Sequence, residues 1–176
     1  CKDGDLFSIG KALDKTDIFK EDVMKQMVSV KTMLNFGFLG YKAQENKFSY
    51  PRPTEDKVLA LFRAMKEIAD YSVIDCTSDA DDLISRMAMT ESDSVVQMIT
   101  PDLKCMGYYS SQADMFAAVS ERSIKVMCIC DRDLYLPTDE VKAHFKNVAF
   151  TLPFSRPLKQ QVITGTLSER LADRKY

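Results

Sequence analysis

The sequence predicts an α/β fold in which a doubly wound, mostly parallel sheet carries helices on both faces. Apolar residues alternate along the chain between a helical period and short runs typical of buried strands. Strand–helix–strand repeats of this length favour parallel pairing with right-handed crossovers. The chain has 176 residues, of which 45% are hydrophobic and 28% charged. We therefore expect a single domain over residues 1–176, large enough to bury a substantial core.

The amino-terminal part predicts short elements followed by one long helix. Short helices are expected over 8–14 and 19–27 with Ser8 and Asp17 as N-caps, extended segments over 28–30 and 36–41, and a surface loop over 42–53. Thr54 begins the clearest helix, because Glu55 and Asp56 occupy its first turn, where the helix dipole favours acids. Its apolar stripe consists of Val58, Leu61, Phe62, Met65 and Ile68.

The remainder of the chain alternates strands and helices. Strands are expected over 71–76, 94–99, 124–130 and 148–152, and helices over 82–90, 103–119 and 138–145, the last capped by Thr138. A final helix begins after Ser155 as its cap, with Pro157 in its first turn and Gly165 just past its end.

The run over 69–78 is the first candidate for a functional site, because its apolar part stops on Asp75 between two helical patterns. An acid at the carboxyl end of a strand in an α/β sheet points into the crevice where such folds bind ligands. Asp75 is a candidate catalytic residue that would hold a metal ion or orient a metal-bound water, and Thr77 and Ser78 can reach phosphate oxygens. The alternative is that Asp75 only caps the next helix.

Two further candidate regions follow later strands. They contain Pro101 and Asp102, then Cys128, and finally Pro153 with Phe154. Because parallel strands deliver their carboxyl ends to the same rim, all of these residues can face one ligand. Phe154 would flank a base ring, or would be an aromatic at the edge of the core.

Other motifs have ordinary structural interpretations. The glycines at 4 and 10 do not have P-loop spacing, Ala12 stands where the hydroxyl should be, and no strand precedes them, so this segment is a loop leading into a helix. Cys128 and Cys130 are too close in sequence for a zinc knuckle and are interpreted as small core residues. His144 is the only histidine and lies near a helix end, without a nucleophile beside it.

Charge and cysteine content limit the class of protein. The net charge of −2 gives no electrostatic footprint for nucleic acid or an anionic membrane, although the segment 155–176 is basic. Five cysteines, an odd number without framework spacing, indicate a reducing, cytoplasmic compartment. No apolar run approaches the roughly 20 residues that span a bilayer, so no membrane insertion is expected.

From about Thr54 onward, the order of these pieces resembles the ParA/MinD-like ATPases of the deviant P-loop (SIMIBI) class, particularly ParA-like proteins of firmicute plasmids and conjugative elements. The resemblance rests on the runs 69–76, 96–104 and 150–156, together with Gly165. It implies a P-loop NTPase-like domain that binds ATP and Mg²⁺, closes as a homodimer, and partitions or positions a plasmid, mobile element or other bacterial cargo. In that family Asp75 would belong to the second acidic motif, and 150–156 would be the base-side loop. An activator protein is a possible further partner.

The departures from that family leave alternatives open. The sequence contains no G-x-x-x-x-G-K-[ST] loop and opens at Cys1. We expect roughly 40 further residues upstream with the first central strand and the P-loop, because a doubly wound sheet without that strand would leave unpaired backbone in its core. Similar proteins place an asparagine near Cys128 to read adenine, so nucleotide choice is open. A catalytically degenerate scaffold that binds a partner is the alternative, and a DNA-binding regulator has little support.

Overall fold

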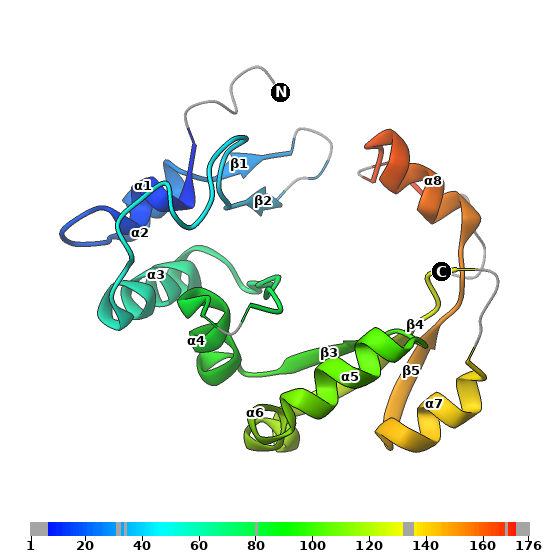
Figure 1. Ribbon diagram of the computed structural model, residues 1–176. Helices are drawn as coiled ribbons and strands as arrows, with labels where there is room; N and C mark the ends of the chain where they lie inside the picture. Colours follow the sequence, from blue (N-terminus) through cyan, green and yellow to red (C-terminus); the bar gives the residue numbers. More distant parts are fainter. Residues whose placement is uncertain are drawn as a thin grey trace. The chain divides into compact units, whose positions relative to one another are not determined.

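The computed structural model describes residues 7–30, 33, 35–79, 81–131, 136–167 and 169–171 (Figure 1). The chain divides into two compact units, Cys1–Glu91 and Ser92–Tyr176. Each unit has its own hydrophobic core. The coarse expectation of a mixed α/β protein with a parallel sheet is confirmed.

The first unit is mainly helical. Its helices are α1 (Ile9–Leu13), α2 (Lys20–Met24), α3 (Glu55–Ile68) and α4 (Leu83–Glu91), and its strands β1 (Val28–Ser29) and β2 (Gly37–Phe38) form an antiparallel pair. Thr54 caps α3 as predicted, since its hydroxyl accepts a hydrogen bond from the amide of Lys57 at 3.4 Å. Ser8 caps α1 in the same way. Asp17 does not cap α2, because that helix begins three residues later, at Lys20, and Phe19 occupies the N-cap position.

The core of the first unit forms around the apolar stripe of α3. Val58 and Leu61 are completely buried there and pack with Leu13 of α1, Val23 of α2 and Ala88 of α4. The helical period read from the sequence therefore identifies the buried face of α3 correctly.

The predicted strand over 71–76 is wrong. This segment is irregular in the structure, and Tyr71 and Val73 are 91% and 94% exposed. Only Ile74 packs against the core of the unit. A strand is stabilised by hydrogen bonds to a neighbouring strand, and no described strand pairs with this segment.

The second unit contains a parallel sheet with the strand order β3–β4–β5 in its described residues (Figure 1). Its elements are β3 (Val95–Ile99), α5 (Leu103–Ser111), α6 (Ala113–Ala118), the short 3₁₀ helix η1 (Ser120–Arg122), β4 (Ser123–Cys128), α7 (Thr138–Phe145), β5 (Val148–Leu152) and α8 (Arg156–Thr164). Each pair of neighbouring strands is joined through helices, as parallel pairing requires.

Helices α5 and α7 pack on the same face of this sheet. Ile99 and Met127 point to that face and are completely buried with Val141 and Phe145 of α7. The ring of Tyr109 in α5 contacts Phe145 at a centroid distance of 5.2 Å. On the opposite face, large side chains stay exposed, among them Val96 at 56% and Phe150 at 62%.

Three local predictions in this unit have mixed outcomes. The helix expected over 103–119 is broken at Gln112, whose backbone leaves helical geometry with φ −115° and ψ 24°. The cap of α7 is Pro137 rather than Thr138. The last helix is as predicted, because Ser155 caps α8 and Gly165 follows its end with φ 70°, a conformation that glycine adopts without strain.

A membrane-spanning helix would need to be longer and more apolar than any helix in the described residues.

Candidate functional site

The candidate site in the second unit is the edge of the sheet where the three parallel strands end. Ile99 pairs with Met127 and Cys128 pairs with Leu152, so the strands finish at nearly the same level. Pro101 and Asp102 follow β3, Cys128 ends β4, and Pro153 and Phe154 follow β5. The structure therefore places these five predicted residues along one edge, as expected for parallel strands.

The carboxylate of Asp102 is engaged in capping α5. Its Oδ1 accepts a hydrogen bond from the amide of Cys105 at 2.8 Å. The pKa of Asp102 is lowered, first by a hydrogen bond with the side chain of Thr100 and then by the amide of Cys105. Pro101 beside it is buried. Asp102 is thus an ionised side chain at the start of a helix, where an N-cap acid is ordinary.

Phe154 is half-buried at the other end of this edge. The ammonium of Lys159 lies 5.7 Å from the centroid of its ring and also pairs with Asp131 at 2.6 Å. The cation therefore covers the aromatic ring, while Pro153 remains exposed. Lys159, one of the basic residues of the segment 155–176, therefore makes its contacts within the second unit.

Cys128 and Cys130 are free thiols at the end of β4. Cys128 is half-buried and Cys130 is exposed, so the interpretation of both as core residues is wrong for Cys130. The pKa of Cys128 is raised, first by burial and then by the neighbouring thiol of Cys130. The thiol of Cys130 donates a hydrogen bond to the carbonyl oxygen of Cys128 at 3.8 Å.

The candidates Asp75, Thr77 and Ser78 lie in the first unit, on exposed irregular backbone that precedes α4. The amide of Thr77 donates a hydrogen bond to Oγ of Ser85 at 3.0 Å, and that hydroxyl donates to Oδ2 of Asp82 at 2.5 Å. This chain of hydrogen bonds ties the segment to the first turn of α4. The position that first singled out Asp75, the end of a buried strand, is not found.

The pKa of the Cys76 thiol is affected by the negative charge of Asp75. Its pKa is raised, first by burial and then by the carboxylates of Asp75 and Asp82. A hydrogen bond with Ser85 opposes this shift. Asp79, further along, forms an ion pair with Lys47. The carboxylates of Asp75, Asp79 and Asp82 therefore concentrate negative charge at this turn, and the ion pair with Lys47 neutralises part of it.

Among the residues that the structure describes, no group of three or more His, Cys, Asp or Glu side chains could hold a metal ion. Mg²⁺ on nucleotides is commonly held by one or two carboxylates together with phosphate oxygens and water. A single carboxylate such as Asp75 fits that donor set.

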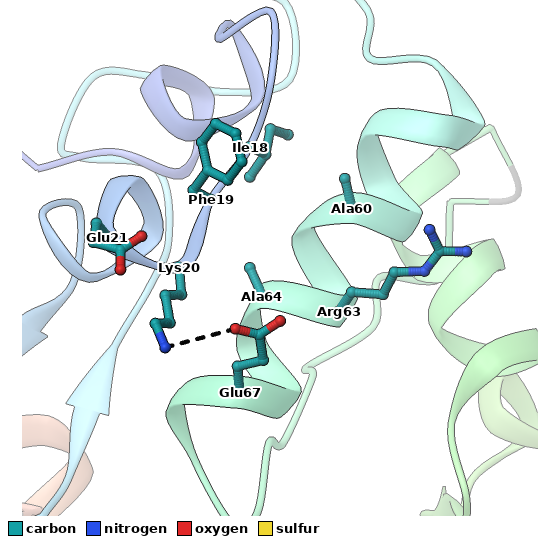
Figure 2. A pocket seen from close by; sticks show the side chains of 8 residues that line it. All are labelled: Ile18, Phe19, Lys20, Glu21, Ala60, Arg63, Ala64 and Glu67. Atoms are coloured by element: carbon teal, nitrogen blue, oxygen red, sulfur yellow. Dashed lines mark ion pairs between the residues drawn. The ribbon is translucent and has the colours of Figure 1, made fainter.

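Sequence reasoning missed a pocket between the start of α2 and helix α3, with a volume of about 460 Å³. Its walls come from residues Ile18, Phe19, Lys20, Glu21, Ala60, Arg63, Ala64 and Glu67. Figure 2 shows Lys20 and Glu67 facing each other at its edge, 3.8 Å apart. The spacing of Ala60, Ala64 and Glu67 along one helix face is the signal that could have indicated it.

Sequence reasoning also missed a polar cluster that anchors the loop over 42–53. The hydroxyls of Ser8 and Tyr50 donate hydrogen bonds to the Glu45 carboxylate at 2.5 and 2.9 Å. Burial alone would raise the pKa of Glu45, but these two hydrogen bonds and the ammonium of Lys42 lower it. Ser8 is fully buried, so this loop is fixed to the start of α1.

Comparison with known proteins identifies no relative, since the chain matches no protein-family model, no curated protein and no solved structure.

Proposed function

We propose that this chain is part of a ParA/MinD-type ATPase, a nucleotide-dependent dimer switch that partitions or positions a plasmid, mobile element or cellular cargo. The observation that supports it is the shared edge of the β3–β4–β5 sheet. Pro101, Asp102, Cys128, Pro153 and Phe154 lie there in the chain order that the resemblance implies. We also propose that the complete fold is a doubly wound sheet with helices on both faces.

In this proposal the edge of the sheet receives the base. Phe154 flanks the ring, Pro153 shapes the loop beside it, and Cys128 lines the floor of the base site. The thiol of Cys128 lacks the paired donor and acceptor of an amide. We therefore expect weaker discrimination between adenine and guanine than an asparagine would give.

The phosphates and the metal are assigned to other residues. Asp75 holds Mg²⁺ or orients the attacking water, and the hydroxyls of Thr77 and Ser78 approach phosphate oxygens. Magnesium supplies charge neutralisation at the phosphates when bound. A P-loop, which the sequence does not contain, would hold the phosphates themselves. Bound nucleotide closes a homodimer, and hydrolysis opens it.

The test is a titration of the full-length product of the reading frame with a fluorescent ATP analogue and Mg²⁺. The Asp75→Asn variant removes one charge without changing size, and Asp70→Asn is the matched control on the same exposed segment. We expect micromolar binding, with turnover lost in Asp75→Asn and retained in Asp70→Asn. Failure of the folded full-length protein to bind nucleotide would refute the ATPase.

A scaffold that binds a partner protein is the second candidate. Two groups at the sheet edge are already engaged within the fold, since Asp102 caps α5 and Lys159 covers the ring of Phe154. This pattern favours a structural role for the edge. The same titration separates the two candidates, because a scaffold would remain folded and would show neither ATP binding nor ATP-dependent dimerisation in light scattering.

A further inference from the structure

The face of the β3–β4–β5 sheet opposite α5 and α7, called here the open face, is apolar throughout. Its side chains alternate along the strands with those of Ile99 and Met127, which are buried beneath the helices. The residues on the open face are Val96, Met98, Ile124, Val126, Cys128, Phe150 and Leu152. None of them carries a charge, and the five largest remain between 37% and 62% exposed. A parallel sheet is ordinarily covered on both faces, so the open face requires an apolar cover.

Helix α8 of the same unit also presents apolar side chains to solvent. Val162 and Ile163 in its last turn are 59% and 71% exposed. None of its nine described residues is buried. A helix this short does not persist alone in water, so it needs an apolar surface to pack against. The open face and the last turn of α8 are therefore two surfaces of one unit that each need an apolar partner.

The start of α8 is held at the carboxyl edge of the sheet. The helix follows β5 closely, and Ser155 caps its first turn. The ammonium of Lys159 in that turn pairs with Asp131, just past the end of β4, at 2.6 Å. From this anchored start the helix continues past the end of β5 (Figure 1). Its last turn is thus available to a surface on another molecule.

The sizes of the open face and of α8 are compatible. Three strands about 4.8 Å apart, with five residues at about 3.3 Å each, give a face of roughly 14 by 17 Å. The nine residues of α8 span about 13 Å and, with side chains, about 10 Å in width, so the helix fits on the face along its whole length. One such contact is small beside the roughly 800 Å² that each partner buries in a stable complex. Two reciprocal contacts double the buried area, because each copy then contributes one helix and one face.

We propose that two copies of this chain form a symmetric dimer in which α8 of each copy packs on the open face of the other. Each copy thus receives the helix layer that the second face of its parallel sheet requires. Neither the open face nor the last turn of α8 carries a charge, so the dimer depends on apolar burial and changes little with ionic strength. It forms without nucleotide and does not rest on the proposed ATPase activity.

The experiment is multi-angle light scattering of the full-length protein without nucleotide, over a series of concentrations. We expect a dimer at micromolar concentrations. Combining Val162→Lys with Ile163→Lys should weaken dimerisation by at least about 100-fold, because a charge buried without a partner is strongly destabilising. Gln160→Lys, at an exposed polar position of the same helix, is the matched control and should leave the dimer unchanged. Circular dichroism checks that each variant is folded.

The reciprocal arrangement also predicts recovery in a mixture of two defective variants. Phe150→Glu alters the open face at a side chain that is 62% exposed, and this variant should also be a monomer. When it is mixed with the lysine variant of α8, one of the two contacts is unaltered and the other brings opposite charges together. Dimers should therefore form in the mixture, although neither variant dimerises alone.

Three results would overturn the proposal. One is a folded unaltered protein that is a monomer at every concentration, which would mean that another part of the same chain covers the open face. Another is a dimer that tolerates the substitutions in α8, which would mean that the copies meet through a different surface. The third is a mixture of the two variants that stays monomeric.

Discussion

The glycine at position 10 provides the sharpest test of the packing in the first unit. Gly10 is buried in the first turn of α1, directly against the ring of Tyr50. A Cβ atom added there would lie 2.7 Å from Cγ of Tyr50 and closer still to two other ring carbons. No real Cβ approaches a ring that closely, so Gly10→Ala must displace Tyr50, whose hydroxyl binds Glu45.

The expected cost follows from two opposing effects. Overpacking a well-packed site costs about 1–3 kcal/mol. Alanine is a better helix former than glycine, but the gain is less than about 1 kcal/mol. Gly10→Ala should therefore destabilise the protein by about 1–2 kcal/mol, because the steric cost exceeds the gain in helix propensity.

The measurement is urea denaturation followed by circular dichroism, with hydrogen exchange of the α1 amides to locate the change. Gly107→Ala in α5 is the matched helical control, because nothing lies within 4 Å of a Cβ at that position. It should stabilise the protein by about 0.5–1 kcal/mol. The reasoning fails if both substitutions change stability in the same direction.

Two further predictions concern backbone strain and acid stability. Lys146 has φ 50° and ψ 150° at the end of α7, a backbone conformation that is strained for any residue with a side chain. Lys146→Gly should therefore raise the free energy of unfolding by about 1 kcal/mol in the same urea assay. An unchanged denaturation midpoint would contradict this. The lowered pKa of Glu45 means that its carboxylate stabilises the fold above pH 4.5 and that this contribution is lost as pH falls through the folded-state pKa. Glu45→Gln should therefore be less stable than wild type at neutral pH, with the gap closing in acid; a gap independent of pH would refute the role of the charge.

Local signals account for the parts of the fold that the sequence predicts well. Helix α3 has a cap, acids in its first turn and an apolar stripe, all within 15 residues of one another. Helix α8 has Ser155 at its start and Gly165 after its end. Strands β3 and β5 are short apolar runs bounded by turns. Each of these signals acts between near neighbours in sequence, so the sequence alone contains the needed information.

The failures depend on partners that are distant in sequence. The run over 71–76 has the composition of a strand, but composition cannot supply the neighbouring strand that it needs. The contact between Ser8 and Glu45 joins residues 37 positions apart, and no periodicity indicates it. At the candidate site, the sheet edge was predictable because it follows from strand ends, whereas the argument for Asp75 depended on the strand that is absent.

Lys125, on the central strand β4 of the second unit, connects this strand to the end of helix α7. The ammonium of Lys125 in β4 donates hydrogen bonds to the carbonyls of Phe145 and Lys146 at 2.7 and 3.5 Å, where α7 ends. Helix α7 has only eight residues, too few to persist alone in water. Its last carbonyls become acceptors for this lysine only when β4 is in place. Helix α7 and strand β4 should therefore open and close as one cooperative unit, with matching rates of amide exchange.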